Sequence, residues 1–383
     1  MMKYPIYLDY NATCPLDERV LKAMLPYFSE HFGNPASRSH LFGWKAQEAI
    51  DIAREQVAEL IHANPKEIVF TSGATESNNL ALKGLFEHFS PEKNHIITLP
   101  TEHKAILDVC LHLEKLGAEI TLLQPDSSGM ISPEAVEKAI RPNTFLISIM
   151  YANNEIGTIQ DIAKIGALAK KHNVLFHTDA TQAVGKVSVD VREENIDLLS
   201  MSGHKLYGPK GIGVLYVNAK SDAKNLVAQM DGGRHQRGFR SGTLNVPLIV
   251  GLGKACEIAQ FELKKVAKQT ENLRNQLEQG ILQHVAGTSI NGHIEKRLPN
   301  VSNISFEGLD GERLLDSFKE IAVSSGSACT SASIEPSHVL KSIGLSDELA
   351  QASIRFSVGK YTTQSDIDFT IHYVKEIVES LKL

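Results

Sequence analysis

Three short polar runs stand directly after stretches rich in β-branched residues, and their side chains are of types that do chemistry together. The turn TSGATES (71–77) follows EIVF, the run DATQ (179–182) follows VLFHT, and the run SGHK (202–205) follows DLLSM. The first run also opens a helical pattern. Small residues at a helix N-terminus let backbone N–H groups approach an anion, where the helix dipole favours negative charge. Taken alone, such a turn is equally typical of a helix cap.

Lys205 closes the third run and is its most reactive side chain. A lysine whose stem leaves an apolar sheet edge is partly desolvated, which lowers the pKa of its amine and favours a covalent bond to a carbonyl carbon. A solvated surface lysine is the alternative for Lys205 alone, and a helix cap is the alternative for Asp179. Together, an anion-binding turn, an acid and a lysine are the three contacts that pyridoxal phosphate needs. The acid keeps the pyridine nitrogen protonated, the turn holds the phosphate, and the lysine bonds to the aldehyde carbon.

The glycine-containing runs of this sequence do not match the known nucleotide-binding motifs. The turn at 71–77 lacks the GxxxxGK[ST] pattern, and GPKGIG (208–213) precedes a strand rather than a helix. We therefore do not expect the anion to belong to a nucleotide.

The surrounding sequence predicts the elements that must position these runs. Between about residues 45 and 255, short apolar strands alternate with helical periods, which is typical of a mostly parallel sheet between layers of helices. The seven predicted strands are EIVF, HIITL, AEITLL, TFLISIM, NVLFHTD, DLLSMS and GVLYV. In such sheets the ligand binds at the carboxyl ends of the strands, where the three runs stand.

The chain of 383 residues is long enough for two domains. We expect a large domain over 15–260. A smaller α+β domain is expected to combine 1–14 with 261–383 and to carry a mobile Ser/Gly-rich loop at about 324–336.

Composition narrows the class of protein further. The formal net charge of −6 disfavours nucleic-acid binding, and no apolar run is long enough to cross a membrane. The four cysteines are scattered without a CxxC pair, so we expect neither disulfides nor a stable metal site. The N-terminal residues have the layout of neither a signal peptide nor a transit peptide, so we expect neither. These features predict a soluble cytoplasmic protein.

The order and spacing of six motifs resemble the cysteine desulfurases of the IscS/NifS type, within the class V aminotransferases of pyridoxal-phosphate fold type I. The motifs are TSGATESNN, TEHKA, NNEIG, DATQ, SGHKLYGPKGIG and RSGT. The resemblance extends from YLDYNAT, at residue 7, to the final predicted helix. It implies an α/β fold with a seven-stranded sheet and pyridoxal 5'-phosphate as the cofactor.

The resemblance also implies residue roles. The cofactor contacts would be Ala74, Thr75, His103, Asn154, Asp179, Gln182, Ser202, His204, Lys205 and Thr243. Of these, Lys205 would bond to the cofactor, and His103 would stack on its ring and assist proton transfers. Gln182 would contact the ring hydroxyl.

Three of the implied roles concern the substrate and a second subunit. Thr243 would reach the cofactor phosphate of a partner subunit, which implies a homodimer. Asn154 and Arg355 would bind the substrate, with Arg355 gripping its carboxylate, although an interface salt bridge is the alternative for Arg355.

Cys329 selects the reaction. It lies in SSGSACTSAS, a segment too poor in core-forming side chains to bury a thiol, and reactive thiols are partly exposed. Cys110 and Cys256 are expected to be buried, and Cys14 is ambiguous. The segment resembles the long active-site loop of the group I desulfurases. The implied reaction converts L-cysteine to L-alanine and leaves a persulfide on Cys329.

A thiol is only a few per cent ionised at neutral pH, so we expect His103 or a nearby charge to help deprotonate Cys329. The implied sulfur acceptors are an iron–sulfur scaffold protein and the enzymes of tRNA thiolation. The sequence does not decide whether Cys329 binds iron transiently. Three alternatives to a cysteine desulfurase also remain: a selenocysteine lyase, an ordinary class V aminotransferase and a non-catalytic protein that has kept the fold.

Overall fold

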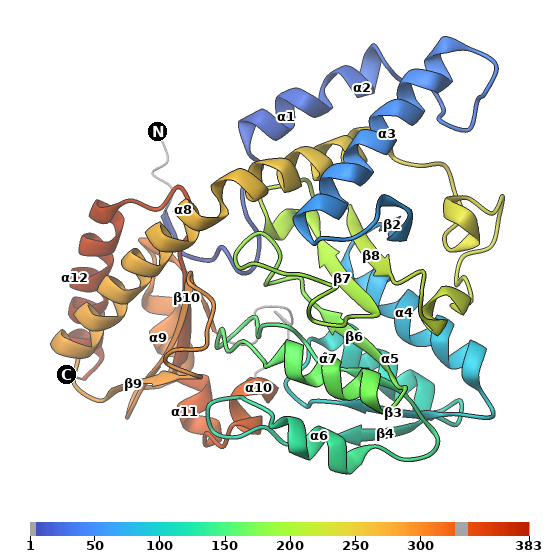
Figure 1. The fold of residues 1–383 in the computed structure, drawn as a ribbon. Coiled ribbons are helices and arrows are strands. Elements are labelled where there is room, and N and C mark those ends of the chain that lie inside the picture. Colours follow the sequence, from blue (N-terminus) through green and yellow to red (C-terminus); the bar gives the residue numbers. More distant parts are fainter. Residues whose placement is uncertain (1–4, 326–335, 383) are drawn as a thin grey trace.

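Seven strands form the central sheet of the computed structural model, which describes residues 5–325 and 336–382 (Figure 1). The strands are β2 (Ile68–Thr71), β3 (His95–Thr98), β4 (Glu119–Leu122), β5 (Thr144–Ser148), β6 (Leu175–Asp179), β7 (Leu198–Ser202) and β8 (Gly213–Val217). Their order is β2-β8-β7-β6-β5-β3-β4, and only β8 runs antiparallel to its neighbours. Each coincides with a predicted strand, so the predicted fold class is confirmed.

Helices cover both faces of this sheet because successive strand residues point to opposite sides. Val69 packs in the core beneath α4 (Ala74–Phe89) and α5 (Lys104–Glu114). Phe70, its neighbour, packs in the core on the other face. The helices on that face are α3 (Leu41–Leu60), α6 (Pro133–Ala139), α7 (Ile162–Lys171) and the first half of α8 (Val246–His284).

A smaller antiparallel sheet lies beside the large one. Its strands, in spatial order, are β12 (Ser324–Ser325), β13 (Ser353–Ser357), β10 (Val301–Phe306) and β9 (Thr288–Asn291). Its core includes side chains of α9 (Gly311–Ser317), α12 (Gln364–Leu381) and the second half of α8. The chain start joins this part, because β1 (Ile6–Tyr7) pairs with β11 (Ile321–Ala322). The shorter helices are α1 (Glu18–Met24), α2 (Pro26–Ser29), α10 (His338–Ser342) and α11 (Asp347–Gln351).

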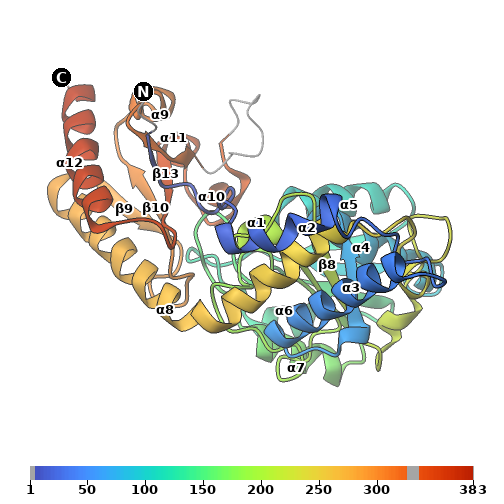
Figure 2. The same cartoon turned by 90° about the horizontal axis from the view of Figure 1, so that it is seen from above.

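The long helix α8 connects the two parts (Figure 2). It packs against α1 and α3 near its start and against α12 near its end. Gly251 and Gly253 lie in its first half, although glycine is a poor helix former. Both glycines serve packing: a Cβ on Gly253 would lie 2.6 Å from the Cα of Ala53 in α3. The expected domain boundary at 260 falls inside α8, and the division into domains stays a prediction.

None of the helices in the described ranges combines the length and the apolar character needed to cross a bilayer.

An enclosed ion pair fastens α8 to the small sheet. The guanidinium of Arg297 donates to both carboxylate oxygens of Glu278 on α8, at 2.7 and 2.8 Å. The two side chains are 6% and 8% exposed, and Ser302 of β10 donates to the same carboxylate at 2.6 Å. Removing one partner of such a pair leaves a buried charge without compensation.

We therefore expect Arg297→Met to lower the free energy of unfolding by about 3–5 kcal/mol. A matched control is Arg141→Met, which breaks the Arg141–Glu119 pair between half-exposed side chains. That change should cost at most about 1 kcal/mol, because water screens the pair. Urea denaturation of the three proteins measures both effects. Equal losses in the two variants would contradict the role given to the buried pair.

Candidate active site

A cavity of about 580 Å³ opens at the carboxyl ends of the central strands. This size lies within the range of roughly 300–1,000 Å³ typical of small-molecule sites. All predicted cofactor residues except Thr243 line it, together with Arg355. Thr243 is exposed and does not line the cavity, and Cys329 lies outside the described residues.

Lys205 enters the cavity from the turn that follows β7. Its Nζ donates to the carbonyl oxygens of Asn11 and Ala12, both at 2.6 Å. The backbone of the same turn is tied to the N-terminal segment, since Cys14 N donates to His204 O at 2.9 Å. The N-terminal segment therefore holds both the amine and the backbone of this turn.

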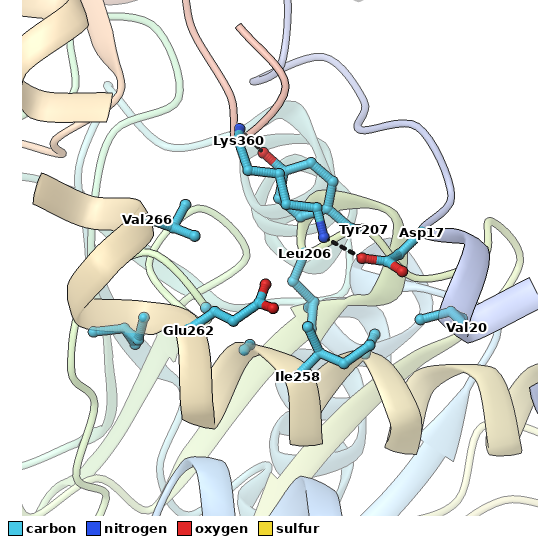
Figure 3. A pocket seen from close by; sticks show the side chains of 12 residues that line it. Asp17, Val20, Leu206, Tyr207, Ile258, Glu262, Val266 and Lys360 are labelled. Atoms are coloured by element: carbon cyan, nitrogen blue, oxygen red, sulfur yellow. Dashed lines mark hydrogen bonds and ion pairs between the residues drawn. The ribbon is translucent and has the colours of Figure 1, made fainter. Parts of the chain in front are cut away.

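Tyr207 lies behind this turn in an unusual conformation. Its φ of 62° is in the left-handed region, which non-glycine residues adopt only when their surroundings impose it. Asp17 N donates to its carbonyl at 3.0 Å, and Lys360 N donates to its hydroxyl at 2.8 Å. The Lys360 ammonium also lies 4.2 Å from the ring centroid and pairs with Asp17, at one side of a small pocket (Figure 3). These contacts fix the chain two residues beyond Lys205.

Asp179 ends β6 with its carboxylate held by two donors. Asn78 Nδ2 donates to Oδ2 at 2.7 Å, and Thr181 N donates to Oδ1 at 3.0 Å. A carboxylate has about four acceptor positions, so Asp179 can still accept from a protonated ring nitrogen. The alternative interpretation as a helix cap is incomplete, because Asp179 also faces the cavity.

The predicted anion turn lies at the start of α4. Its N-cap residue, Gly73, makes no side-chain capping hydrogen bond, so N–H groups of the first turn are available to a ligand. Gly213 of β8 makes room for this turn: a Cβ there would lie 2.6 Å from the Cα of Gly73. No role could be assigned to GPKGIG beforehand, because this contact depends on the pairing of Thr71 with Gly213 in the sheet.

His204 joins the anion side of the cavity as a neutral imidazole. Burial lowers its pKa to about 4, and the charges of Lys205, Lys210 and Lys186 act in the same direction. Its Nδ1 lies 3.1 Å from Thr13 Oγ1.

His103 caps α5, because its Nδ1 accepts from Ala105 N at 3.1 Å. An accepting Nδ1 carries no proton, so neutral His103 carries its proton on Nε2. The preceding Glu102 is fully buried and accepts from Met150 N at 2.7 Å. Burial raises the pKa of Glu102 well above its usual value, which favours the neutral carboxyl.

Arg355, on β13, brings a cation from the small sheet. Its guanidinium donates to Asp9 Oδ1 at 2.7 Å and to the carbonyl of Asn154 at 3.1 Å. Arg355 thus forms a salt bridge, but within the chain, and it still lines the cavity. Among the described residues, Arg355 Nε is one of the buried polar atoms that lack a hydrogen-bond partner.

The sequence reasoning missed several lining residues. Asn11, Ala12 and Thr13 belong to the YLDYNAT motif, which carried the resemblance without receiving a role. Ser72 lies in TSGATES and Lys210 in GPKGIG. Their only sequence signal is their place within these motifs.

The residues present fit pyridoxal phosphate. The cavity combines a helix N-terminus for the phosphate, a carboxylate with spare acceptor positions for the ring nitrogen, and a lysine amine. The Nε of Arg355 and the Oγ1 of Thr181 are orphaned polar atoms on cavity-lining residues, within the part of the chain that the structure describes.

Comparison with known proteins gives the family. The model of the class V aminotransferases matches residues 6–369. The cysteine desulfurase IscS of Vibrio vulnificus (strain CMCP6) is 54% identical over 383 residues, which is 100% of this chain and 94% of that protein. The protein of the same name from Histophilus somni (strain 2336) is 56% identical with the same coverage.

Two solved structures agree with this result. A NifS-like protein has a TM-score of 0.91 at 39% identity and covers 98% of this chain and 100% of its own. SspA in complex with cysteine has a TM-score of 0.82 at 44% identity and covers 94% of this chain and 100% of its own. The chain therefore belongs to the class V aminotransferases, pyridoxal-phosphate enzymes, among the cysteine desulfurases of the IscS/NifS type.

Proposed function

We propose that this protein is a cysteine desulfurase that converts L-cysteine to L-alanine and carries the sulfur as a persulfide on Cys329. The observation that carries the proposal is the single cavity that brings together Lys205, Asp179, His103 and Arg355. The solved SspA structure contains cysteine, which supports cysteine as the substrate here.

Bound pyridoxal phosphate supplies an electron sink that stabilises negative charge at the α-carbon of an amino acid. The α4 N-terminus, Ser202 and His204 hold the anionic end of the cofactor, and Asp179 accepts from its ring nitrogen. Arg355 binds the substrate carboxylate, since a planar guanidinium matches a carboxylate with two parallel hydrogen bonds. Its present contacts with Asp9 and Asn154 orient the guanidinium at the cavity.

Side chains of the protein carry out the transfers of protons and of sulfur. Lys205 Nζ accepts the proton from the substrate α-carbon. The Cys329 thiolate then attacks the substrate sulfur, so that an S–S bond forms while the bond between sulfur and β-carbon breaks. The electron pair of the broken bond stays with the β-carbon, which takes up a proton, and Lys205 then returns a proton to the α-carbon to give alanine. His103, with its Nε2 proton, assists these transfers.

The sulfur acceptors follow from the family resemblance. We place the protein in the cytoplasm, where the persulfide is passed to an iron–sulfur scaffold protein or to the enzymes of tRNA thiolation. Scattered free cysteines support a reducing compartment: Cys14, Cys110 and Cys256 are buried and unpaired in the described part of the chain.

A homodimer is the second part of the proposal. Large apolar side chains gather on α1, α2 and the start of α3, and each is 42–66% exposed. We call this the apolar patch: Leu21, Leu25, Phe28, Phe32, Leu41, Phe42 and Trp44. Such a cluster is unusual on a monomer and favours a subunit interface. Thr243 would then reach the cavity of the partner, which agrees with its exposure in the single chain.

The reaction is tested by comparing Cys329→Ser and Lys205→Ala with the parent enzyme. Both changes should lower alanine formation from cysteine by about two orders of magnitude or more, because each removes a reacting group. Cys329→Ser should also lose the protein-bound persulfide while keeping the near-visible absorbance of the cofactor. Cys110→Ala, which removes a buried thiol on α5, is the matched control and should keep both activities.

Normal release of sulfide and alanine by Cys329→Ser would contradict the role of this thiol. A parent protein that stays colourless with added cofactor would contradict the whole reaction. Turnover of selenocysteine well above that of cysteine would favour the selenocysteine lyase instead.

The dimer is tested by sedimentation. The parent should sediment at twice the 42.0 kDa of the chain. Phe28→Asp places a charge in the apolar patch and should shift the protein toward the monomer and weaken cofactor binding, because the Thr243 contact is lost. Phe261→Asp is the control, since Phe261 is 82% exposed on α8 and outside the patch. A monomeric parent, or a Phe28→Asp dimer as tight as the parent, would contradict the proposed interface.

A further inference from the structure

Lys186 is a lysine close to the cavity for which the reaction above has no use. It follows DATQ by four residues and lines a second, smaller pocket with Cys14, Tyr207 and Asn300. No carboxylate forms an ion pair with its ammonium among the residues that the structure describes. A charge kept near a site without a counter-ion calls for an explanation.

The ammonium of Lys186 bridges two side-chain amides. It donates to Asn11 Oδ1 at 3.0 Å and to Gln182 Oε1 at 2.5 Å. An ammonium has donors only, so each amide must turn its oxygen toward Lys186 and its NH₂ group away. Gln182 Nε2 consequently donates to the carbonyl of Asn11 at 2.9 Å, and Asn11 Nδ2 donates to the carbonyl of Asn154 at 3.1 Å. Exchanging oxygen and nitrogen in either amide would set NH₂ against NH₃⁺.

These amides lead directly to the reacting groups. The Asn11 carbonyl that accepts from Gln182 also accepts from Lys205 Nζ at 2.6 Å. The Asn154 carbonyl that accepts from Asn11 also accepts from Arg355. Gln182 lines the cavity, and its second amide hydrogen is available to a ligand there.

The surroundings of Lys186 disfavour the charged form of its amine. Burial lowers its pKa to about 7, the charges of Lys205 and Arg355 lower it further, and Cys14 acts in the opposite direction. Keeping a proton there costs free energy, which the hydrogen bonds to Asn11 and Gln182 offset only in part. A lysine that served only packing would not need this arrangement.

We propose that Lys186 is a positioning residue that fixes the amide of Gln182 toward the cofactor ring and the carbonyl of Asn11 toward Lys205. The proposal rests on the cofactor site of the proposed function. Lys186 acts through Gln182 and Asn11 and touches neither cofactor nor substrate.

A double-mutant cycle on cofactor affinity tests this route. Apoprotein of the parent, Lys186→Met, Gln182→Ala and the double variant is titrated with pyridoxal 5'-phosphate and followed by near-visible absorbance. Lys186→Met should raise the dissociation constant about tenfold, the size of one lost buried hydrogen bond. In the Gln182→Ala background the same change should have less than about a threefold effect, because contacting residues are coupled. The control is Lys138→Met, an exposed lysine on α6, which should bind like the parent.

Equal losses in both backgrounds would overturn the proposal, and so would an unchanged dissociation constant in Lys186→Met. If Lys186→Met does not fold, Lys186→Gln takes its place in the cycle. It keeps a shorter, neutral donor and should bind with intermediate affinity, whereas parent-like binding would overturn the proposal.

A second readout needs no cofactor. The folded pKa of Lys186, about 7, lies below its unfolded value of about 10.4, so between these values the unfolded apoprotein holds a proton that the folded one has lost. The parent should therefore gain stability relative to Lys186→Met as the pH rises from 7 to about 10. The facing groups Cys14, Tyr207, Lys205 and Arg355 are the same in both proteins. A constant difference would overturn the burial of the Lys186 amine beside Asn11 and Gln182, even if no cofactor bound at all.

Discussion

The hydrogen bonds from Lys205 to the carbonyls of Asn11 and Ala12 are the contact on which the rest of the site depends. The segment that offers these carbonyls starts in the small sheet, where Leu8 is part of the core and Asp9 bridges to Ser357. It then crosses to the turn after β7. One short segment, which turns at residues 10–12, thus connects the small sheet, with Arg355, to the large sheet, with Lys205.

Positive charge dominates the cavity that this segment closes. Lys205, Lys210 and Arg355 line it, with Lys186 behind. Such an arrangement is costly, because like charges repel and burial removes water. The low pKa values of His204 and Lys186 express that cost. A phosphate and a carboxylate, both anionic, reduce it, so the same residues that repel one another in the cavity favour its ligands.

The sheet could be predicted from the sequence because its strands are continuous apolar runs, as in EIVF and TFLISIM. The location of Asp179 and Lys205 in the site could be predicted as well, because both come directly after strands, at the edge of the sheet where ligands bind. The continuity of α8 across the expected boundary at 260 was missed, because Gly251 and Gly253 are poor helix formers whose benefit appears only where α1 and α3 pack closely. The roles of Asn11, Lys186 and Gly213 were missed for the same reason. Each depends on a partner far away in the chain. The roles of Thr243 and Cys329 stay predictions from the motifs alone.

The continuity of α8 has a mechanical consequence. Its 39 residues correspond to a rod of about 58 Å at about 1.5 Å per residue. Ile249 and Leu252 near one end are embedded in the core of the large sheet, and Leu277 and Ile281 near the other end are embedded in the core of the small one. A hinge between the two sheets would have to bend this rod or pull one end out of its core. The two walls of the cavity between them are therefore held in place. The protein adapts to a substrate by movements of side chains and loops and not by closure of one half upon the other.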